Sequence, residues 1–92
     1  MIKTIKHKGL KRLYERGDQS KLPADRVNKI ILMLTVLDAA ETLEPINRPA
    51  WRLHTLRGDL EGFYAIDVSG NYRLIFRFDD GDVFDLDFVD YH

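Results

Sequence analysis

Cysteine is absent from the sequence, which excludes a disulfide framework and any metal site that relies on thiolates. No apolar run approaches the roughly 18 residues of a membrane span. The opening residues also lack the apolar core of a signal peptide. We therefore expect a soluble, cytoplasmic protein that does not associate with membranes.

Proline is scarce as well, with three residues in 92, and glycine contributes six. Apolar residues make up 45% of the chain and aromatic residues 11%, which is enough to build a hydrophobic core and argues against disorder. A chain of this length forms one core rather than two. We predict a single domain over residues 1–92.

Basic residues are rare in the C-terminal part of the chain and abundant in the rest. Residues 58–92 contain two Lys/Arg and nine Asp/Glu, whereas residues 1–57 contain 12 Lys/Arg and six Asp/Glu. The two balances, −7 and +6, sum to the net charge of −1. A basic surface of this kind suits contact with phosphates, although the same side chains also solvate an ordinary surface helix. Both interpretations stay open.

Helical periodicity is confined to the first half of the chain. An apolar stripe that stops before Gly17 predicts a helix over residues 8–16. Pro23 suits the first turn of a second helix, which is predicted to open at Leu22 and to run to about residue 40. We interpret the stripe of this helix as core; it consists of Val27, Ile30, Ile31, Leu34 and Leu37.

An alternation of period two predicts strands in the remainder. A short strand is predicted for residues 1–6, and four more after a loop at residues 42–49, namely 51–56, 63–68, 72–78 and 83–88. Asp80 and Gly81 signal a hairpin before the last strand, where Phe84, Leu86 and Phe88 are expected to point inward.

The predicted fold class is therefore α+β, with a short N-terminal strand and two helices packed on a mainly antiparallel sheet of four or five strands. The helices must cover one face of the sheet, because their apolar stripes have no other surface to bury against. The opposite face then carries polar side chains, among them Arg73 and Arg77.

Side chains that handle protons or bind phosphate gather near the predicted strand ends. The candidates are His54, Arg73, Asp90, Tyr91 and His92. Cleavage of a phosphodiester needs a base, an acid and cations for the developing charge, and this set contains all three. Each residue also has a structural interpretation, such as a half-buried His54 or an ion-paired Asp90. A metal site of His54, Asp90 and His92 is a further alternative, although its spacing matches no local motif.

Several segments together resemble the HigB toxins of the RelE/ParE superfamily. They are Leu53-His54-x-Leu56-Arg57-Gly58-Asp59, Gly62-Phe63-Tyr64-Ala65-Ile66, Asn71-Tyr72-Arg73-Leu74-x-Phe76 and Asp90-Tyr91-His92, together with the opening Ile2-Lys3-x-Ile5-Lys6-His7-Lys8-Gly9-Leu10. The resemblance covers the whole chain and implies a RelE-like microbial RNase fold. It also implies a toxin that cleaves mRNA in the ribosomal A site, without a metal or cofactor, by attack of the 2′-hydroxyl to give a 2′,3′-cyclic phosphate.

Residue by residue, the resemblance carries catalytic roles to five positions. His92 or Asp90 would accept the 2′ proton, His54 would protonate the leaving oxygen, Tyr91 would align the substrate, and Arg73 would neutralise the phosphorane.

The resemblance also implies a cognate helix-turn-helix antitoxin of the HigA type, and the ribosome and mRNA as partners. The expected ribosome and RNA contacts are Arg57, Lys6, Lys8, Lys11 and Arg12; Arg57 stands where relatives often have lysine. The alternative is a ParE-like inhibitor of DNA gyrase, which uses the same fold without catalysis.

Overall fold

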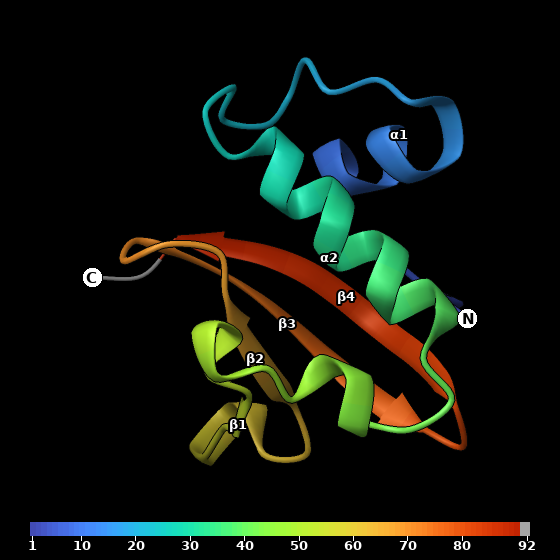
Figure 1. Ribbon diagram of the computed structural model, residues 1–92, viewed down its shortest axis with the longest axis vertical. Helices are drawn as coiled ribbons and strands as arrows, with labels where there is room; N and C mark the ends of the chain where they lie inside the picture. Colours follow the sequence, from blue (N-terminus) through green and yellow to red (C-terminus); the bar gives the residue numbers. More distant parts are fainter. Residues whose placement is uncertain (91–92) are drawn as a thin grey trace.

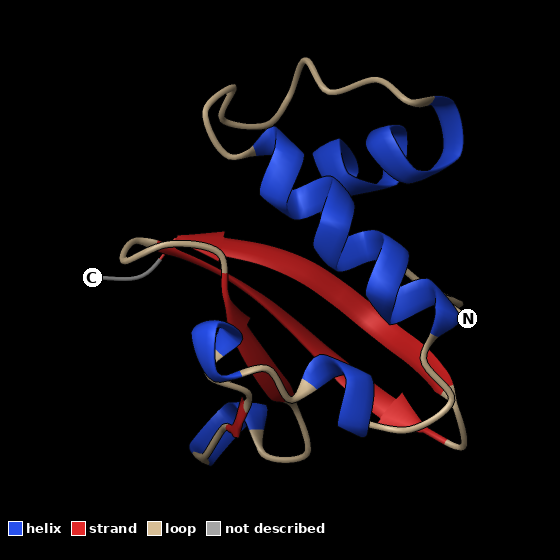
Figure 2. Ribbon diagram, viewed as in Figure 1, coloured by secondary structure: helices blue, strands red, loops and turns tan. Residues whose placement is uncertain are grey.

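Two helices lie over one face of a four-stranded antiparallel sheet in the computed structural model (Figure 1; Figure 2). The described residues are 1–90; Tyr91 and His92 lie outside them. The helices are α1 (Lys8–Arg16) and α2 (Val27–Ala39), and the strands, adjacent in chain order, are β1 (His54–Thr55), β2 (Tyr64–Asp67), β3 (Tyr72–Asp79) and β4 (Asp82–Asp90). Single 3₁₀ turns are η1 (Glu44–Ile46), η2 (Pro49–Trp51) and η3 (Gly58–Leu60).

The bounds of α1 confirm the prediction from the sequence. His7 caps its start, with the ring Nδ1 accepting a hydrogen bond from the Leu10 amide at 3.1 Å. Gly17 ends it in the left-handed conformation (φ 70°), where its amide donates to the carbonyls of Arg12 and Leu13. Both ends are therefore set by local chemistry that is visible in the sequence.

The second helix begins at Val27, so the predicted start at Leu22 was wrong. Pro23 opens a separate turn instead, closed by a hydrogen bond of 3.0 Å from the Arg26 amide to the Pro23 carbonyl. Pro23 contributes only its carbonyl to this turn, so its missing amide hydrogen costs no hydrogen bond.

The predicted strand at residues 51–56 was largely wrong, because only His54–Thr55 pairs as β1. Trp51 ends η2 and is 4% exposed within the core. Arg52 follows in the left-handed conformation (φ 52°), which turns the chain before the sheet begins. Burial of one large aromatic side chain has thus overridden the local alternation.

A β-bulge in β4 reverses the predicted alternation at Phe84. Asp85 adopts a left-handed conformation (φ 54°), and the register with β3 shifts between Ile75 and Arg77. Val83 is therefore fully buried, whereas Phe84 was wrongly predicted to point inward and is only partly covered. One extra residue in a strand exchanges the faces of the residues before it.

The predicted N-terminal strand is reduced to two isolated parallel bridges along β4, at Ile2–Val83 and Ile5–Leu86. The amides of Lys3 and Lys6 donate to β4 carbonyls at 2.8 and 2.7 Å. This segment covers part of the outer edge of the sheet, which would otherwise expose unpaired backbone groups.

The core lies between the helices and the sheet. Its fully buried members include Leu10, Ile30, Met33, Leu37, Ile66, Leu74, Phe76 and Leu86. Within residues 1–90, no helix is long and apolar enough to cross a membrane.

Candidate active site

The sheet face turned away from the helices carries the predicted site residues of β1 and β3. His54 pairs with Ala65, and Ala65 with Ile75, so these three side chains share one face. Arg73 lies two residues before Ile75 and belongs to the same face, paired with Asp67 and with Val89. Sequence alternation had predicted this side for Arg73.

Two apolar residues of this face are buried. Ala65 is fully buried and Ile75 is 6% exposed, although neither belongs to the core beneath the helices. The Lys6 ammonium lies 5.6 Å from the centroid of the Phe63 ring. Lys6 sits beside β4 and Phe63 just before β2, so this contact spans β3 and β4 on this face.

His54 is exposed on this face, with one ring nitrogen held by the backbone. Its Nδ1 lies 2.6 Å from the carbonyl oxygen of Arg52. Because a carbonyl oxygen only accepts hydrogen bonds, we assign the proton of the neutral ring to Nδ1. Nε2 is then the position that takes up or releases a proton, which is the arrangement that an acid–base histidine needs.

A row of three charged residues lies beside His54. Asp67 places Oδ2 3.5 Å from Nε of Arg52, its side chain is only 15% exposed, and its register partner on the other side is Arg73. The ion pair holds Arg52 beside the face, and the two arginines with one carboxylate leave the row with a net positive charge. The sequence analysis missed Asp67. The available signal was its spacing, because it lies two residues after Ala65 on β2 and therefore on the same face.

Two further predicted residues lie at the margins of the face. Asp90 is the last residue of β4, exposed, and pairs with Tyr72. By the alternation of the strand its side chain leaves the sheet on the side opposite to Arg73. Arg57 is exposed in extended backbone at the start of η3. The predicted Tyr91 and His92 lie outside the described residues.

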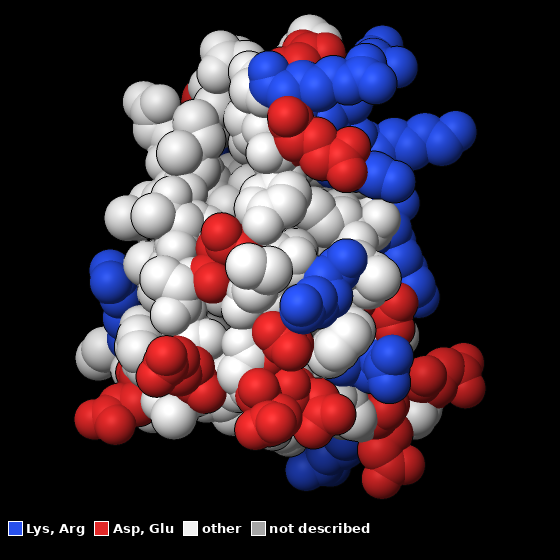
Figure 3. Space-filling model, turned by 90° about the vertical axis from the view of Figure 1, so that its right-hand side faces the viewer, with Lys and Arg blue, Asp and Glu red and all other residues white. Residues whose placement is uncertain are grey.

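The predicted ribosome contacts are divided between two places. Lys8, Lys11 and Arg12 line a shallow hollow on the outer side of α1 together with Arg16 and Glu15. Lys6 lies apart from them, over Phe63. Figure 3 shows Lys and Arg gathered at the top of the molecule, where α1 lies, and Asp and Glu mainly at the bottom, so the charge polarity of the sequence persists in space.

A metal site finds no support among residues 1–90, where no three His, Asp or Glu side chains group closely enough to hold an ion. The alternative site of His54, Asp90 and His92 includes a residue outside that range and stays a hypothesis.

Solved structures of other bacterial proteins have a similar fold. One is a chain of the YoeB–YefM complex from Staphylococcus aureus, which shares 20% identity at a TM-score of 0.58, with 100% of this chain and 95% of that chain covered. YafQ from Escherichia coli shares 16% identity at a TM-score of 0.56, with 95% of this chain and 87% of that chain covered. The fold is that of the RelE-like toxins.

Sequence comparison narrows this class to one family. The family model of the HigB-like toxins, described as RelE-like toxins of type II toxin–antitoxin systems, matches residues 3–92, and the chain belongs to this family. It is 45% identical to Endoribonuclease HigB of Proteus vulgaris over the full length of both proteins. It is also 35% identical to Toxin HigB-1 of Vibrio cholerae, with 88% of this chain and 87% of that protein covered.

Proposed function

We propose that the chain is a ribosome-dependent endoribonuclease that cleaves mRNA in the ribosomal A site and so inhibits translation. The observation that carries this proposal is His54, exposed on the sheet face opposite the helices, with Nδ1 hydrogen-bonded to the Arg52 carbonyl and Nε2 left to exchange a proton. Full-length similarity to a protein named Endoribonuclease HigB supports the same reaction class.

The proposed reaction is an internal transesterification that needs no metal ion. The ribose 2′ oxygen bonds to the adjacent phosphorus, the bond from phosphorus to O5′ breaks, and a 2′,3′-cyclic phosphate and a 5′-hydroxyl result. Of the two expected bases, His92 takes the 2′ proton, because the Asp90 side chain leaves β4 on the side opposite to Arg73. Protonated His54 gives its Nε2 proton to O5′. Arg73 offsets the charge that develops on the phosphorane, and Tyr91 aligns the substrate.

The ribosome and an antitoxin complete the proposal. Docking of the basic α1 surface on ribosomal RNA would let the ribosome present the mRNA, so free RNA should be a poor substrate. Membership of a type II toxin family implies an antitoxin, which we propose to be a helix-turn-helix protein of the HigA type. The proposed site of action is the cytoplasm, where translation occurs.

The test is to map new 5′ ends on a defined mRNA, with and without programmed ribosomes and with and without EDTA. Cuts confined to the A-site codon of ribosome-bound mRNA, insensitive to EDTA and lost in a folded His92→Ala variant, would agree with the proposal. A metal-dependent cut on free RNA would contradict it in favour of the metal site. Absence of any cut, together with inhibited DNA supercoiling by gyrase, would replace it with the ParE-like alternative.

A further inference from the structure

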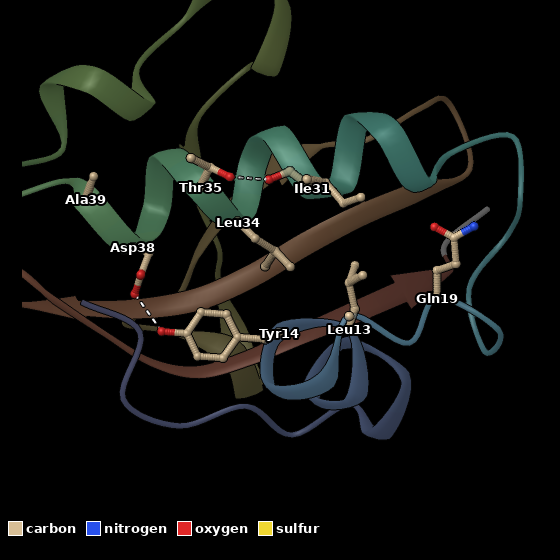
Figure 4. Close-up of a pocket in the computed structure, with 9 residues that line it drawn as sticks. Leu13, Tyr14, Gln19, Ile31, Leu34, Thr35, Asp38 and Ala39 are labelled. Atoms are coloured by element: carbon tan, nitrogen blue, oxygen red, sulfur yellow. Dashed lines mark hydrogen bonds between the residues drawn. The ribbon is translucent and has the colours of Figure 1, made fainter.

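A groove of about 540 Å³ runs between α1 and α2, on the side of the molecule away from the candidate active site (Figure 4). Its walls are mainly apolar and are formed by Leu13, Tyr14, Ile31, Leu34, Thr35 and Ala39. Asp38 also lines it, but its Oδ1 accepts hydrogen bonds from the Tyr14 hydroxyl at 2.7 Å and the Ile2 amide at 2.9 Å. The Asp38 carboxylate is therefore already hydrogen-bonded within the fold.

The part of α2 that borders the groove exposes apolar surface and no charge. Ile31 is 40% exposed on the groove wall, and the other exposed residues of this wall are Thr35 and Ala39, neither of which is charged. Exposed apolar surface beside a groove of this kind marks an interaction surface.

The occupant of the groove is a protein rather than RNA. The groove is lined by no Lys or Arg among the described residues, whereas a phosphate backbone is bound by cations. Cations lie instead along one margin, where Lys11 precedes Tyr14 by three residues and so shares its side of α1. A partner that buries apolar side chains in the groove would therefore place acidic residues against this margin.

The length of the groove suits a helix. The α2 residues that line it run from Ile31 to Ala39 and extend over roughly 12 Å at about 1.5 Å per residue, which matches about two turns of a partner helix. An amphipathic helix would insert side chains from positions i, i+3, i+4 and i+7. We propose that the groove between α1 and α2 receives an amphipathic helix of the antitoxin, with an apolar stripe and an acidic edge toward α1. This proposal rests on the proposed function, which supplies the partner.

The test compares two adjacent residues of α2 with similar exposure. Ile31 lines the groove and Leu32 lies outside it, so Ile31→Lys and Leu32→Lys introduce the same charge on the same helix in different places. Calorimetric titration with the purified cognate antitoxin should show affinity reduced at least about tenfold by Ile31→Lys and changed less than about twofold by Leu32→Lys. The association rate of the unmodified toxin should fall with added salt.

Ala39→Arg, which fills the groove from its other end, replaces Ile31→Lys if that variant does not melt cooperatively. Equal affinities for groove and control variants would overturn the proposal. So would a toxin homodimer, seen by sedimentation of the toxin alone, that Ile31→Lys dissociates, since the groove would then receive a second copy of the chain.

Cleavage of ribosome-bound mRNA by the same free toxins separates the two proposals. A toxin that cleaves but binds the antitoxin regardless of Ile31 contradicts the groove alone. A toxin that does not cleave but loses antitoxin binding in Ile31→Lys contradicts the proposed nuclease and supports the groove.

Discussion

The same ring nitrogen serves opposite purposes in His7 and His54. Nδ1 of His7 accepts from the Leu10 amide and caps α1, while its ring meets the Phe88 ring edge-on at a centroid distance of 5.5 Å. Nδ1 of His54 donates to a carbonyl and leaves Nε2 at an exposed surface. Geometry therefore assigns a structural role to His7 and makes His54 available for proton transfer.

Substitution of each histidine by alanine should separate these roles. His54→Ala should lower the rate of A-site cleavage by about a hundredfold or more and leave the free energy of unfolding nearly unchanged. His7→Ala should lower the free energy of unfolding by about 1 kcal/mol and leave cleavage intact, and His7→Asn, which also caps helices, should recover most of this loss. Single-turnover cleavage and urea unfolding provide the two measurements. Equal losses of cleavage in both alanine variants would contradict the assignment.

Asp38 makes stability depend on pH. The pKa of Asp38 is held below its usual value first by the Ile2 amide and then by the Tyr14 hydroxyl, both of which donate hydrogen bonds to its carboxylate. The hydrogen bond to Asp38 raises the pKa of the Tyr14 hydroxyl. A carboxyl with a lowered folded-state pKa contributes stability above its unfolded pKa of about 3.9, and this contribution is lost as the pH falls through the folded value. Asp38→Asn should cost roughly 1 kcal/mol at neutral pH.

The Asp38→Asn difference should shrink as the pH falls from about 5 toward 2, because the wild-type carboxyl is then also neutral. Urea unfolding at a series of pH values measures this. A difference that stays constant over the whole range would show that the Asp38 charge contributes nothing. Tyr14→Phe removes one of the two hydrogen bonds and should give a smaller effect of the same sign.

At the scale of elements, the C-terminal stop of α1 permits a test of backbone strain with a matched control. Gly17 has φ 70°, and no atom lies within 4 Å of the position that an added methyl group would take. Gly17→Ala should therefore lower the free energy of unfolding by about 1 kcal/mol through conformation alone. Gly70 has equal space but no positive φ, so Gly70→Ala should be neutral or slightly stabilising. The measurement is the urea midpoint of each variant. Similar losses of stability in both variants would mean that the left-handed conformation of Gly17 is not the cause.

The elements that could be predicted from sequence are those whose signals are local. The α1 bounds follow from an apolar stripe and a terminal glycine, and the β3–β4 hairpin follows from Asp80 and Gly81. Tertiary contacts decided the rest: Trp51 enters the core and shortens β1, and the bulge at Asp85 turns Val83 inward in place of Phe84. No local pattern encodes either contact.

The candidate site shows the same division. Alternation placed Arg73 on the face opposite the helices, where the register with β1 also sets His54. The contact of Lys6 with Phe63 on this face depends on the pairing of strands distant in the sequence and could not be predicted. Asp67 gains its relevance only from neighbours in space, Arg52 and Arg73.

For the molecule as a whole, the fold keeps the two charge populations of the sequence apart. The positive pole lies on α1, and the β3–β4 hairpin, with Asp79, Asp80 and Asp82, lies at the end of the molecule away from it (Figure 1). Figure 3 shows Asp and Glu mainly at that end. A particle with nearly zero net charge but separated poles is oriented by a polyanion as it approaches, with α1 leading.

Reversal of charge on α1 should therefore weaken ribosome binding more than the same reversal elsewhere. The double variant Lys8→Glu/Lys11→Glu should reduce affinity for ribosomes by at least about tenfold at low salt and flatten the dependence of affinity on salt, because fewer counterions are released. Arg26→Glu/Lys29→Glu changes the net charge equally but lies at the start of α2, outside the α1 hollow. Co-sedimentation with ribosomes across a salt series compares the two. Equal weakening by both would mean that only net charge matters, and the orientation through α1 would be wrong.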